Sequence, residues 1–295
     1  MLVHVAGLGS MGSGMARALL RAGHEVHGRD PVPASVEALT AAGGRALGPG
    51  SPPGEAGLCV VLNAAQMREA LYGAGRLADG LAPGAPIVAC ATVAPAEAVA
   101  MEAEAHARGL LYLDAPISGG AAKAAEGRLS VMASGAPEAF DAAAPLLGAI
   151  AEVVHRLGDA AGPGSAMKAV NQLLAGVHIA AMGEAMAFAA SQRLDLARVV
   201  EVIGASAGNS WMFANRAPHV VDADYVPRSA VDIWPKDLGI VAGIAAEAGL
   251  PLPLVETALA QFRAASAAGM GRDDDAAVAR LVARAGGVAL PGDGA

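Results

Sequence analysis

The sequence predicts an α/β fold in which a doubly wound parallel sheet is followed by an all-α domain, with one long helix joining the two. Three observations predict it. Short apolar runs alternate with helical segments in the first half, only helical periodicity follows residue 165, and a Gly/Pro-rich segment at 158–164 separates the two patterns. Because 295 residues exceed one ordinary domain, we expect one domain over residues 1–161 and a second over residues 162–295.

The strands of the expected sheet are short runs of aliphatic residues connected by helical segments. We expect strands at 2–6, 25–29, 58–62, 87–91, 110–113, 128–133 and 152–156. Helices are expected between them at 11–22 and 95–108. Runs that are apolar throughout are typical of a parallel sheet covered by helices on both faces.

The second half is expected to be entirely helical. Its first helix begins near residue 165, is rich in Ala and could run for about 28 residues. Further helices are expected at 196–206, 230–248 and 252–270. The segment after Gly286 is expected to lack fixed structure.

Composition excludes several classes of protein. The net charge is −8 and no Lys/Arg cluster offsets it, so we expect binding neither to nucleic acid nor to an anionic membrane. Cys59 and Cys90 lie in apolar runs without the spacing of metal ligands, and are expected to be buried, reduced thiols. The N-terminus has no basic region, and polar residues interrupt the long apolar helix. A cytoplasmic protein without a membrane span is therefore expected.

A glycine-rich turn between the first strand and the first helix matches the dinucleotide fingerprint. Its residues are Gly7, Leu8, Gly9, Ser10, Met11 and Gly12. The first glycine allows a tight turn, the second lets a pyrophosphate approach the backbone, and the third permits close packing of helix on sheet. An accidental Gly-rich turn is the alternative, but the strand–turn–helix context favours a Rossmann-type site.

Asp30 ends the second expected strand and bears on the choice of cofactor. An acidic residue there is expected to accept hydrogen bonds from the adenosine ribose and to repel a 2′-phosphate, which favours NAD over NADP. The neighbouring Arg29 tempers this preference, because a guanidinium can instead accommodate that phosphate.

Lys168 is the most informative residue of the second half, because it lies near the start of the long apolar helix. An ammonium among aliphatic side chains is costly to desolvate. Such burial draws the pKa of a lysine towards neutrality, where it can exchange protons with a substrate. Asn171 and Gln172 follow at i+3 and i+4 on the same helix face. The alternative is a lysine whose head reaches water. The junction of two domains, where Lys168 is expected, often holds a small-molecule site.

A second Gly-rich element runs from Asp114 to Gly120, after another expected strand. Ser118 and the amides of Gly119 and Gly120 form a cluster of donors suited to a carboxylate. The alternative is a structural turn capped by Asp114.

Three motifs in this order resemble the β-hydroxyacid dehydrogenase family, which includes 3-hydroxyisobutyrate dehydrogenase. They are GLGSMG at 7–12, DAPISGG at 114–120 and Lys168-x-x-Asn171. The resemblance covers essentially the whole chain and implies a dehydrogenase of a small hydroxy acid. Further stretches at 62–66, 171–181, 206–213, 225–238 and 271–275 are similar to the branch of the family that oxidises L-threonate.

The resemblance implies a role for each matching residue. Lys168 would take the proton of the substrate hydroxyl, Asn171 would hydrogen-bond that hydroxyl, and Ser118, Gly119 and Gly120 would hold the substrate carboxylate. The resemblance also implies contacts of Thr92 with the cofactor and of Lys236 with both cofactor and substrate. Asn63 is a further candidate for the cofactor, and Gln172 and Trp211 are candidates for the substrate, with Trp211 in a loop-like stretch at 209–211. Two positions depart from the family pattern: Gln172 stands where many members have Asn, and Pro235 precedes Lys236, which puts the reach of Lys236 in doubt.

The implied reaction is NAD-dependent oxidation of L-threonate at C2. Within enzymes, the alternative is a tartronate semialdehyde reductase or a dehydrogenase of the 3-hydroxyisobutyrate type. A non-catalytic NAD-binding regulator is the alternative from another class, and the presence of both Lys168 and Asn171 argues against it. By analogy with the family, we expect a homo-oligomer, a dimer or a tetramer.

Other polar residues are expected to have structural roles. His178 is expected to be a hydrogen-bonded core histidine. The acidic run at 273–275 is expected to cap the last helix, and no metal is expected. Ser210, in a loop-like stretch, is as well placed to cap a helix as to line a pocket.

Overall fold

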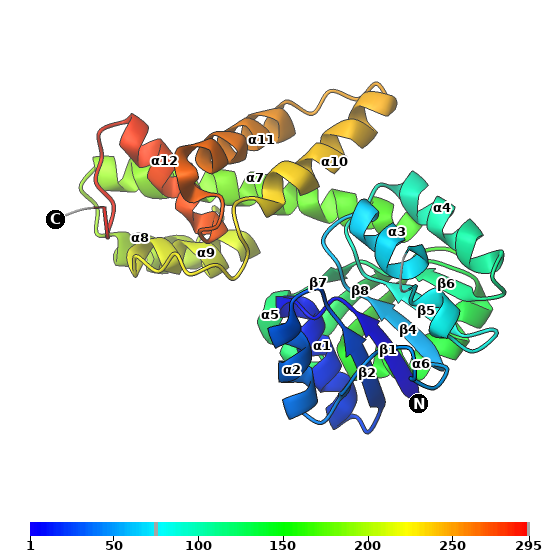
Figure 1. Cartoon of the computed structure of the whole chain (residues 1–295). Coiled ribbons are helices and arrows are strands. Elements are labelled where there is room, and N and C mark those ends of the chain that lie inside the picture. Colours follow the sequence, from blue (N-terminus) through cyan, green and yellow to red (C-terminus); the bar gives the residue numbers. More distant parts are fainter. Residues whose placement is uncertain (74–75, 294–295) are drawn as a thin grey trace. The chain divides into compact units, whose positions relative to one another are not determined.

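A computed structural model describes residues 1–73 and 76–293 of the chain. It separates into two compact units, Met1–Lys168 and Ala169–Ala295. Figure 1 shows that the first contains the sheet and the second is helical. The long helix α7 (Pro163–Ser191) begins in the first unit and continues into the second. The functional boundary expected from the sequence stays a prediction.

The first unit is built on a parallel sheet of six strands in the order β3-β2-β1-β4-β5-β6. The strands are β1 (Leu2–Ala6), β2 (Glu25–Arg29), β3 (Arg45–Ala46), β4 (Ala56–Cys59), β5 (Pro86–Ala89) and β6 (Leu111–Asp114). Because β1 pairs with both β2 and β4, the chain builds one half of the sheet outward from the middle and then returns to build the other. This order confirms the doubly wound fold that the sequence predicts.

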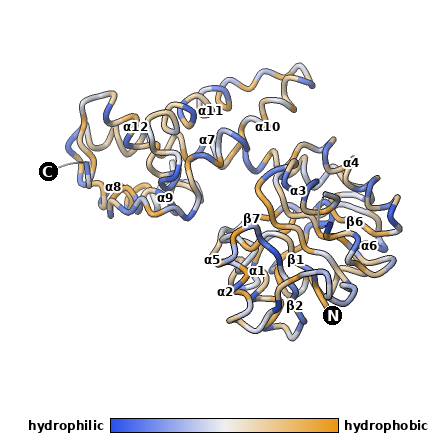
Figure 2. Tube along the Cα trace, in the orientation of Figure 1, coloured by the Kyte–Doolittle hydropathy of each residue, from blue (hydrophilic) through white to orange (hydrophobic). Residues whose placement is uncertain are grey.

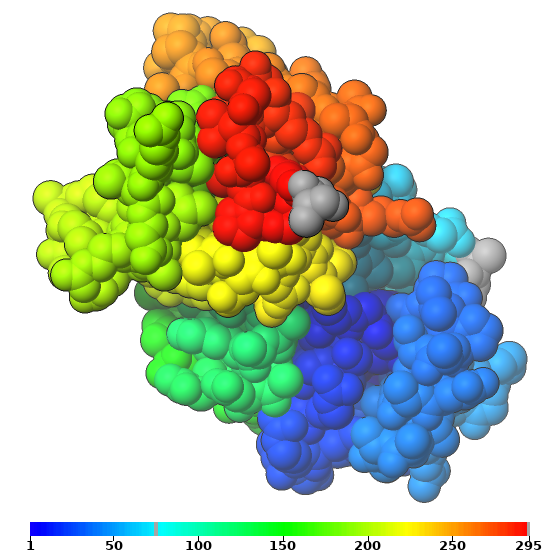
Figure 3. Space-filling model, turned by 90° about the vertical axis from the view of Figure 1, so that its left-hand side faces the viewer, coloured from blue at the N-terminus to red at the C-terminus, as the bar shows by residue number. Residues whose placement is uncertain are grey.

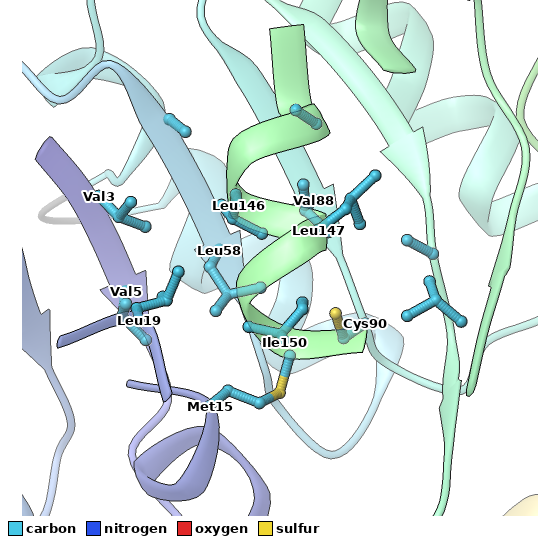
Figure 4. Packing of buried hydrophobic residues seen from close by; sticks show 14 of the residues in the cluster. Val3, Val5, Met15, Leu19, Leu58, Val88, Cys90, Leu146, Leu147 and Ile150 are labelled. Carbon is cyan, nitrogen blue, oxygen red and sulfur yellow. The ribbon is translucent and has the colours of Figure 1, made fainter. Parts of the chain in front are cut away.

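Helices cover both faces of this sheet. They are α1 (Ser10–Arg21), α2 (Pro33–Ala41), α3 (Ala64–Tyr72), α4 (Pro95–His106), α5 (Gly120–Glu126) and α6 (Pro137–Ile150), with a 3-10 turn at Ala78–Gly80. Successive strand residues point to opposite faces. Leu58 therefore joins the core formed with α1 and α6, whereas Cys59 joins the core formed with α3 and α4. Figure 4 shows the first of these cores, with Leu146, Leu147 and Ile150 of α6 lying over the strands.

Two of the expected strands do not extend the parallel sheet, which corrects the prediction. β8 (Leu129–Ala133) pairs with β9 (Ala151–Arg156) in parallel and with β7 (Ile117–Ser118) in antiparallel orientation, forming a separate three-stranded sheet. The chain reverses after β6, and the backbones of Asp114 and Ser134 form an antiparallel bridge. A strand held in that orientation cannot continue a parallel ladder.

The second unit is all-helical, as the sequence predicts. Beyond α7 it contains α8 (Leu196–Gly204), α9 (Trp211–Val221), α10 (Ile233–Glu247), α11 (Pro253–Ala265) and α12 (Val278–Ala285), with a π-helical turn at Ser266–Met270 and a 3-10 turn at Asp275–Ala277. Trp234 of α10 stacks on Phe262 of α11 with ring centroids 5.5 Å apart. This pair adds bulk to a core built mainly of Ala, Val and Leu, since aromatic residues make up only 3% of the chain.

Helix α7 is long and apolar enough to cross a membrane by length and composition alone, with a mean hydropathy of 1.6 over its best window. In this protein it supplies the core of the helical unit. Ile179, Met182 and Met186 are buried and contact the other helices of that unit. The polar residues that interrupt the helix are the blue segments along its trace in Figure 2.

The segment after α12 packs on the second unit, so the prediction that it lacks fixed structure was wrong for residues 287–293. Leu290 is 4% exposed and belongs to the core of this unit, and Asp293 accepts a hydrogen bond from Arg280 at 2.9 Å. Figure 3 shows this segment, in red, against the neighbouring helices of the same unit. Val288 also packs on this core, and Asp293 also pairs with Arg284. These few residues are spread along the segment and give no compositional signal. Residues 294–295 lie outside the described part of the chain.

Two stacked histidines make the stability of the first unit depend on pH. His4 of β1 and His27 of β2 are buried, with ring centroids 5.9 Å apart. Burial lowers the pKa of His4, and positive charge on His27 lowers it further. The hydrogen bond to the Pro52 carbonyl opposes this shift only in part. As the pH falls below about 6.5, the unfolded chain therefore binds a proton at His4 more readily than the folded chain does, so the free energy of unfolding falls.

We expect His4→Gln to reduce this loss between about pH 7 and pH 5, by up to about 1.4 kcal/mol per pH unit. Urea unfolding at a series of pH values measures the slope. His106→Gln, at an exposed position of α4, is the control for replacing an imidazole by an amide. A slope for His4→Gln equal to that of the wild type would contradict the assignment.

Candidate functional site

The site expected for a dinucleotide lies at the carboxyl edge of the parallel sheet, where the loops after β1 and β4 are neighbours. These two strands pair directly, while the chain continues from each of them in opposite directions across the sheet. Such a switch point leaves a crevice outside the strand ends, and doubly wound sheets bind ligands there. The glycine-rich turn lies at this position.

Two glycines of the fingerprint are required by close packing. Gly7 has a φ of +92°, and a Cβ there would lie 2.1 Å from the carbonyl oxygen of Val60, just after β4. A Cβ at Gly12 would lie 2.0 Å from the carbonyl oxygen of Gly7. At Gly9, which precedes the first turn of α1, a Cβ would meet no described atom within 4 Å. The loop therefore packs tightly against neighbouring backbone at Gly7 and Gly12 and has free space beside Gly9. There the N–H groups at the start of α1 can bind an anion.

Asp30, at the end of β2, holds the glycine-rich turn by hydrogen bonds. Its carboxylate accepts hydrogen bonds from the backbone N–H of Leu8 at 2.7 Å and of Val32 at 2.8 Å. Ser10 and Met11 follow in the first turn of α1. The structure therefore gives Asp30 a local role that the sequence analysis did not include, and its expected contact with a ribose stays a prediction.

Asn63 and Thr92 follow the next two strands, β4 and β5, towards the same edge of the sheet. The Asn63 side chain caps α3 by accepting a hydrogen bond from the Gln66 N–H at 2.8 Å, and the Gln66 side chain accepts one from the Leu62 N–H at 2.9 Å. This reciprocal capping gives a structural reason for the sequence at 62–66. Thr92 is half-buried.

The carboxylate of Asp114, at the end of β6, anchors the start of α7. It is 1% exposed. Its Oδ2 accepts hydrogen bonds from the backbone N–H of Gly162 at 3.0 Å and of Ser165 at 2.7 Å, and its Oδ1 accepts one from the Ser165 hydroxyl at 2.7 Å. N–H groups at a helix start have no partner within the helix, so Asp114 supplies one. Asp114 therefore caps α7, and the alternative in which it caps the turn at 118–120 was wrong.

Desolvation dominates the electrostatics of this carboxylate. Burial raises the pKa of Asp114, and the hydrogen bonds from Ser165, Gly162 and Ser134 lower it in part. The N-terminus of α7 is also the positive end of its dipole, which favours a negative group there. The anchor is thus a carboxylate held in a buried place by donors arranged around it.

Lys168 lies three residues after Ser165, a little less than one turn of α7. Its Nζ donates a hydrogen bond to the carbonyl oxygen of Ile117 at 2.9 Å, and the residue is 7% exposed. The alternative in which its head reaches water was therefore wrong. Because Ile117 directly precedes Ser118, the structure brings the ammonium beside the second Gly-rich element.

The element beside Lys168 is a turn between β7 and α5. Ser118 ends β7, and Gly119 and Gly120 carry the chain into α5 with φ values of +136° and +76°. Ser118 is half-buried and Gly120 is exposed. A ligand carboxylate here would find a hydroxyl and backbone N–H groups next to a buried cation, which is a favourable setting for an anion.

In the second unit, a continuous series of polar contacts joins α7 to α10. Asn171 Nδ2 donates a hydrogen bond to Gln172 Oε1 at 2.9 Å, and Gln172 Nε2 donates one to Asp237 Oδ2. Lys236 Nζ forms an ion pair with Asp237 Oδ1. Gln172 and Asp237 are buried, at 7% and 3% exposed. The sequence analysis missed Asp237, although a carboxylate directly after Lys236 and before an apolar run was the available signal.

Lys236 lies at the start of α10 and not in a loop. Pro235 is the third residue of this helix. Proline lacks an N–H, but the first-turn N–H groups of a helix have no helical partner, so it is tolerated there. The backbone around Pro235 is thus helical, and the reach of Lys236 towards a cofactor stays a prediction.

Trp211 is the first residue of α9, so the expectation of a loop-like stretch was wrong at this position. Ser210 caps the helix by accepting a hydrogen bond from the Phe213 N–H at 3.0 Å, which confirms the capping alternative. The Trp211 side chain is 62% exposed. Its contact with substrate stays a prediction.

The acidic run near the C-terminus forms buried ion pairs. Asp275 bonds Arg216 Nε at 2.5 Å and Trp234 Nε1 at 2.9 Å, and Asp274 bonds His219 Nδ1 at 2.9 Å. Burial raises the pKa of Asp275, and the positive charge of Arg216 opposes that rise. Asp274 caps the 3-10 turn Asp275–Ala277, whereas α12 begins after Ala277 without a side-chain cap, so the expected cap of the last helix was wrong by one turn. The partners of Asp274 and Asp275 were not expected from the sequence.

The remaining polar candidates are structural. His178 is half-buried on α7, and its ring makes no hydrogen bond within residues 1–73 and 76–293, contrary to expectation. Cys59 and Cys90 are buried, as predicted, and burial raises the pKa of Cys59 to about 12, so a thiolate is disfavoured there. Among the described residues, no three His, Cys, Asp or Glu side chains gather to hold a metal.

Comparison with known proteins identifies the family. Residues 3–158 match the NAD binding domain of 6-phosphogluconate dehydrogenase, and residues 162–282 match the NAD-binding family of NADP-dependent 3-hydroxyisobutyrate dehydrogenase. An L-threonate dehydrogenase from Cupriavidus necator is 47% identical, over 98% of each chain. The chain belongs to the β-hydroxyacid dehydrogenase family.

Other members of the β-hydroxyacid dehydrogenase family agree with this assignment. The L-threonate dehydrogenase of Escherichia coli K12 is 45% identical over 98% of this chain and 96% of its own. The crystal structure of 3-hydroxyisobutyrate dehydrogenase from Salmonella typhimurium has a TM-score of 0.90 and 47% identity, covering 95% of this chain and 99% of that one. The predicted fold class and the predicted NAD-dependent hydroxyacid dehydrogenase activity are thereby confirmed.

The Asp114 anchor predicts a difference between two substitutions. Asp114→Ala leaves the N–H groups of Gly162 and Ser165 buried without an acceptor, and should lower the free energy of unfolding by about 2–5 kcal/mol. Asp114→Asn should cost much less, because the amide oxygen can accept from both N–H groups while the amide N–H donates to the Ser165 hydroxyl.

Urea unfolding measures both changes, with the exposed Asp141→Asn as the control. An Asp114→Ala variant as stable as the wild type would show that the anchor does not hold α7. Equal losses for the two substitutions would show that the charge matters and the hydrogen-bond geometry does not.

Proposed function

We propose that this β-hydroxyacid dehydrogenase oxidises L-threonate at C2 to the 2-oxo acid, with NAD as the hydride acceptor. The observation that carries the proposal is the contact of the buried Lys168 ammonium with the carbonyl oxygen that directly precedes Ser118. This contact supports the proposal, because an ammonium held next to a turn with several N–H donors is well placed to meet the hydroxyl of a bound hydroxy acid. The L-threonate dehydrogenases at 43–47% identity support the choice of substrate.

The residues at the sheet edge fit a dinucleotide. The open backbone at Gly9 and the N-terminus of α1 would receive the pyrophosphate, with Gly7, Leu8, Ser10, Met11 and Gly12 completing the cradle. Asp30 would meet the adenosine ribose, which favours NAD over NADP. Asn63, Thr92 and Lys236 would make the remaining cofactor contacts. When bound, the nicotinamide supplies the hydride acceptor.

The chain's own residues would handle the substrate and its proton. Ser118, Gly119 and Gly120 hold the carboxylate, and Asn171 hydrogen-bonds the hydroxyl at C2. Lys168 Nζ takes the hydroxyl proton, because the C–H bond can be broken only as the oxygen loses its proton. Gln172 and Trp211 contact the rest of the substrate.

At the level of the whole chain, the proposal assigns dinucleotide binding to residues 1–161, and substrate binding and oligomerisation to residues 162–295. The enzyme acts in the cytoplasm as a dimer or tetramer. A substrate of the 3-hydroxyisobutyrate or tartronate semialdehyde type is the second candidate, supported by the likeness to the Salmonella enzyme.

We expect the wild type to form NADH from L-threonate faster than from D-threonate, erythronate, glycerate, tartronate or 3-hydroxyisobutyrate, and NADPH more slowly than NADH. Lys168→Met, which keeps an apolar stem of similar length, should lower kcat at least about 100-fold and leave NAD affinity nearly unchanged. Absorbance at the NADH band and NAD titration measure the two effects.

Lys123→Met is the matched control, because Lys123 lies on α5 near the same turn and its ammonium pairs with Glu152 at the surface. Full turnover by the Lys168 variant would remove Lys168 from the mechanism. Preference for 3-hydroxyisobutyrate or reduction of tartronate semialdehyde would favour the second candidate. NAD binding without turnover of any acid would favour a regulator.

The fingerprint loop gives a second prediction. Gly9→Ala has room in the folded chain, so its unfolding midpoint should match that of the wild type, while the new methyl group blocks the approach of the pyrophosphate. We expect NAD affinity to fall by at least about 10-fold, measured by calorimetric titration. Gly148→Ala, at an equally open and exposed position on α6, should leave the affinity unchanged. Wild-type affinity in Gly9→Ala would place the dinucleotide elsewhere.

A further inference from the structure

At the buried carboxylate of Asp237, the series of contacts from Asn171 to Lys236 allows only one assignment of donors and acceptors. A carboxylate can only accept hydrogen bonds, and Asp237 is 3% exposed. Gln172 must therefore turn its amide N–H towards Asp237, which is the arrangement found. Its amide oxygen is then the atom that faces Asn171, and an amide oxygen can only accept. Asn171 must therefore donate from Nδ2, which lies 2.9 Å from Gln172 Oε1.

The charge of Lys236 completes this series from the other side. Its ammonium pairs with Oδ1 of Asp237, while Oδ2 receives Gln172. The two oxygens of one carboxylate are thus divided between a cation and an amide. Lys236 and Gln172 both donate to Asp237. If an N–H replaced either carboxylate oxygen, two donors would face each other unless the partner side chain turned round.

From this geometry we propose that Asp237 is a positioning residue that sets which atom Asn171 turns towards Gln172, and thereby which atoms remain for the substrate hydroxyl. The proposal rests on the proposed function, in which Asn171 bonds that hydroxyl. A side-chain amide has nearly the same shape in either orientation, so packing alone selects weakly between them. The buried carboxylate of Asp237, which is linked to Asn171 through Gln172, selects strongly between the two amide orientations. The wrong orientation would leave two N–H donors facing each other.

Asp237→Asn tests the polarity with almost no change in shape. The ammonium of Lys236 can only donate, so it will bond the oxygen of the new amide at position 237. The amide N–H then points towards Gln172. Gln172 must then present its oxygen to position 237 and its N–H to Asn171, which reverses Asn171. We expect kcat for the hydroxy acid to fall about 10- to 100-fold, with a smaller change in KM, because the contact matters most as the hydroxyl reacts.

The double variant Asp237→Asn/Gln172→Glu should restore the original orientation. A carboxylate at position 172 accepts from position 237 and from Asn171 Nδ2 alike, so Asn171 regains its native direction. We expect kcat to return to within about threefold of the wild type. Gln172→Glu alone places two carboxylates in contact beside Lys236, so its activity should fall as the pH rises and their shared proton is lost.

Steady-state kinetics over a range of pH on the four proteins measure these effects, with the exposed Glu247→Gln of α10 as the control. Wild-type kcat in Asp237→Asn, or equal losses in the single and double variants, would overturn the proposal. Urea midpoints give an independent readout, since the double variant should recover stability that each single change loses. If the wild type oxidises no hydroxy acid, the proposed function fails. The midpoints then still decide whether residues 172 and 237 are coupled.

Discussion

The carboxylate of Asp114 at the start of α7 is the interaction on which the placement of Lys168 depends. It joins the last strand of the parallel sheet to the first turn of the longest helix through two backbone N–H groups and one hydroxyl. Lys168 lies three residues after Ser165, slightly less than one helical turn, so the anchor fixes the position of its Cα. The hydrogen bond to Ile117 then fixes where it ends. The buried cation is thus positioned from both sides.

Several residues expected to touch ligands also hold local structure together. Asp30 ties the fingerprint loop to β2, and Asn63 caps α3. A carboxylate or amide oxygen can accept more than one hydrogen bond, so these bonds leave capacity for a ligand. They also keep the edge of the sheet in one conformation before any ligand arrives, which lowers the cost of ordering on binding.

Two stretches of sequence that resemble the threonate-oxidising branch meet in the helical unit. The backbone of Ala230 bridges Asp274, and Asp275 bonds both Arg216 and Trp234. Buried ion pairs of this kind tolerate the loss of one partner poorly. Their effect is to fix the segment that leads into α10, which carries Lys236 and Asp237. The similarity at 225–238 and 271–275 therefore has a structural basis, because each stretch supplies contacts that the other needs.

The sequence by itself determined the order of the elements, the fingerprint turn and the identity of the lysine. Each of these depends on local spacing: apolar periodicity, glycines at fixed offsets, and one cation in an apolar helix. It missed the short helices α2, α3 and α5, and it missed α6 and α9, in which an internal proline weakens the helical signal. It also placed β8 and β9 in the wrong sheet. Only the tertiary structure showed that Asp114 caps α7 and that Asp237 accepts a hydrogen bond from Gln172. Both contacts join residues about 50 or more positions apart, and the direction of a carboxylate across such a distance leaves no trace in local sequence.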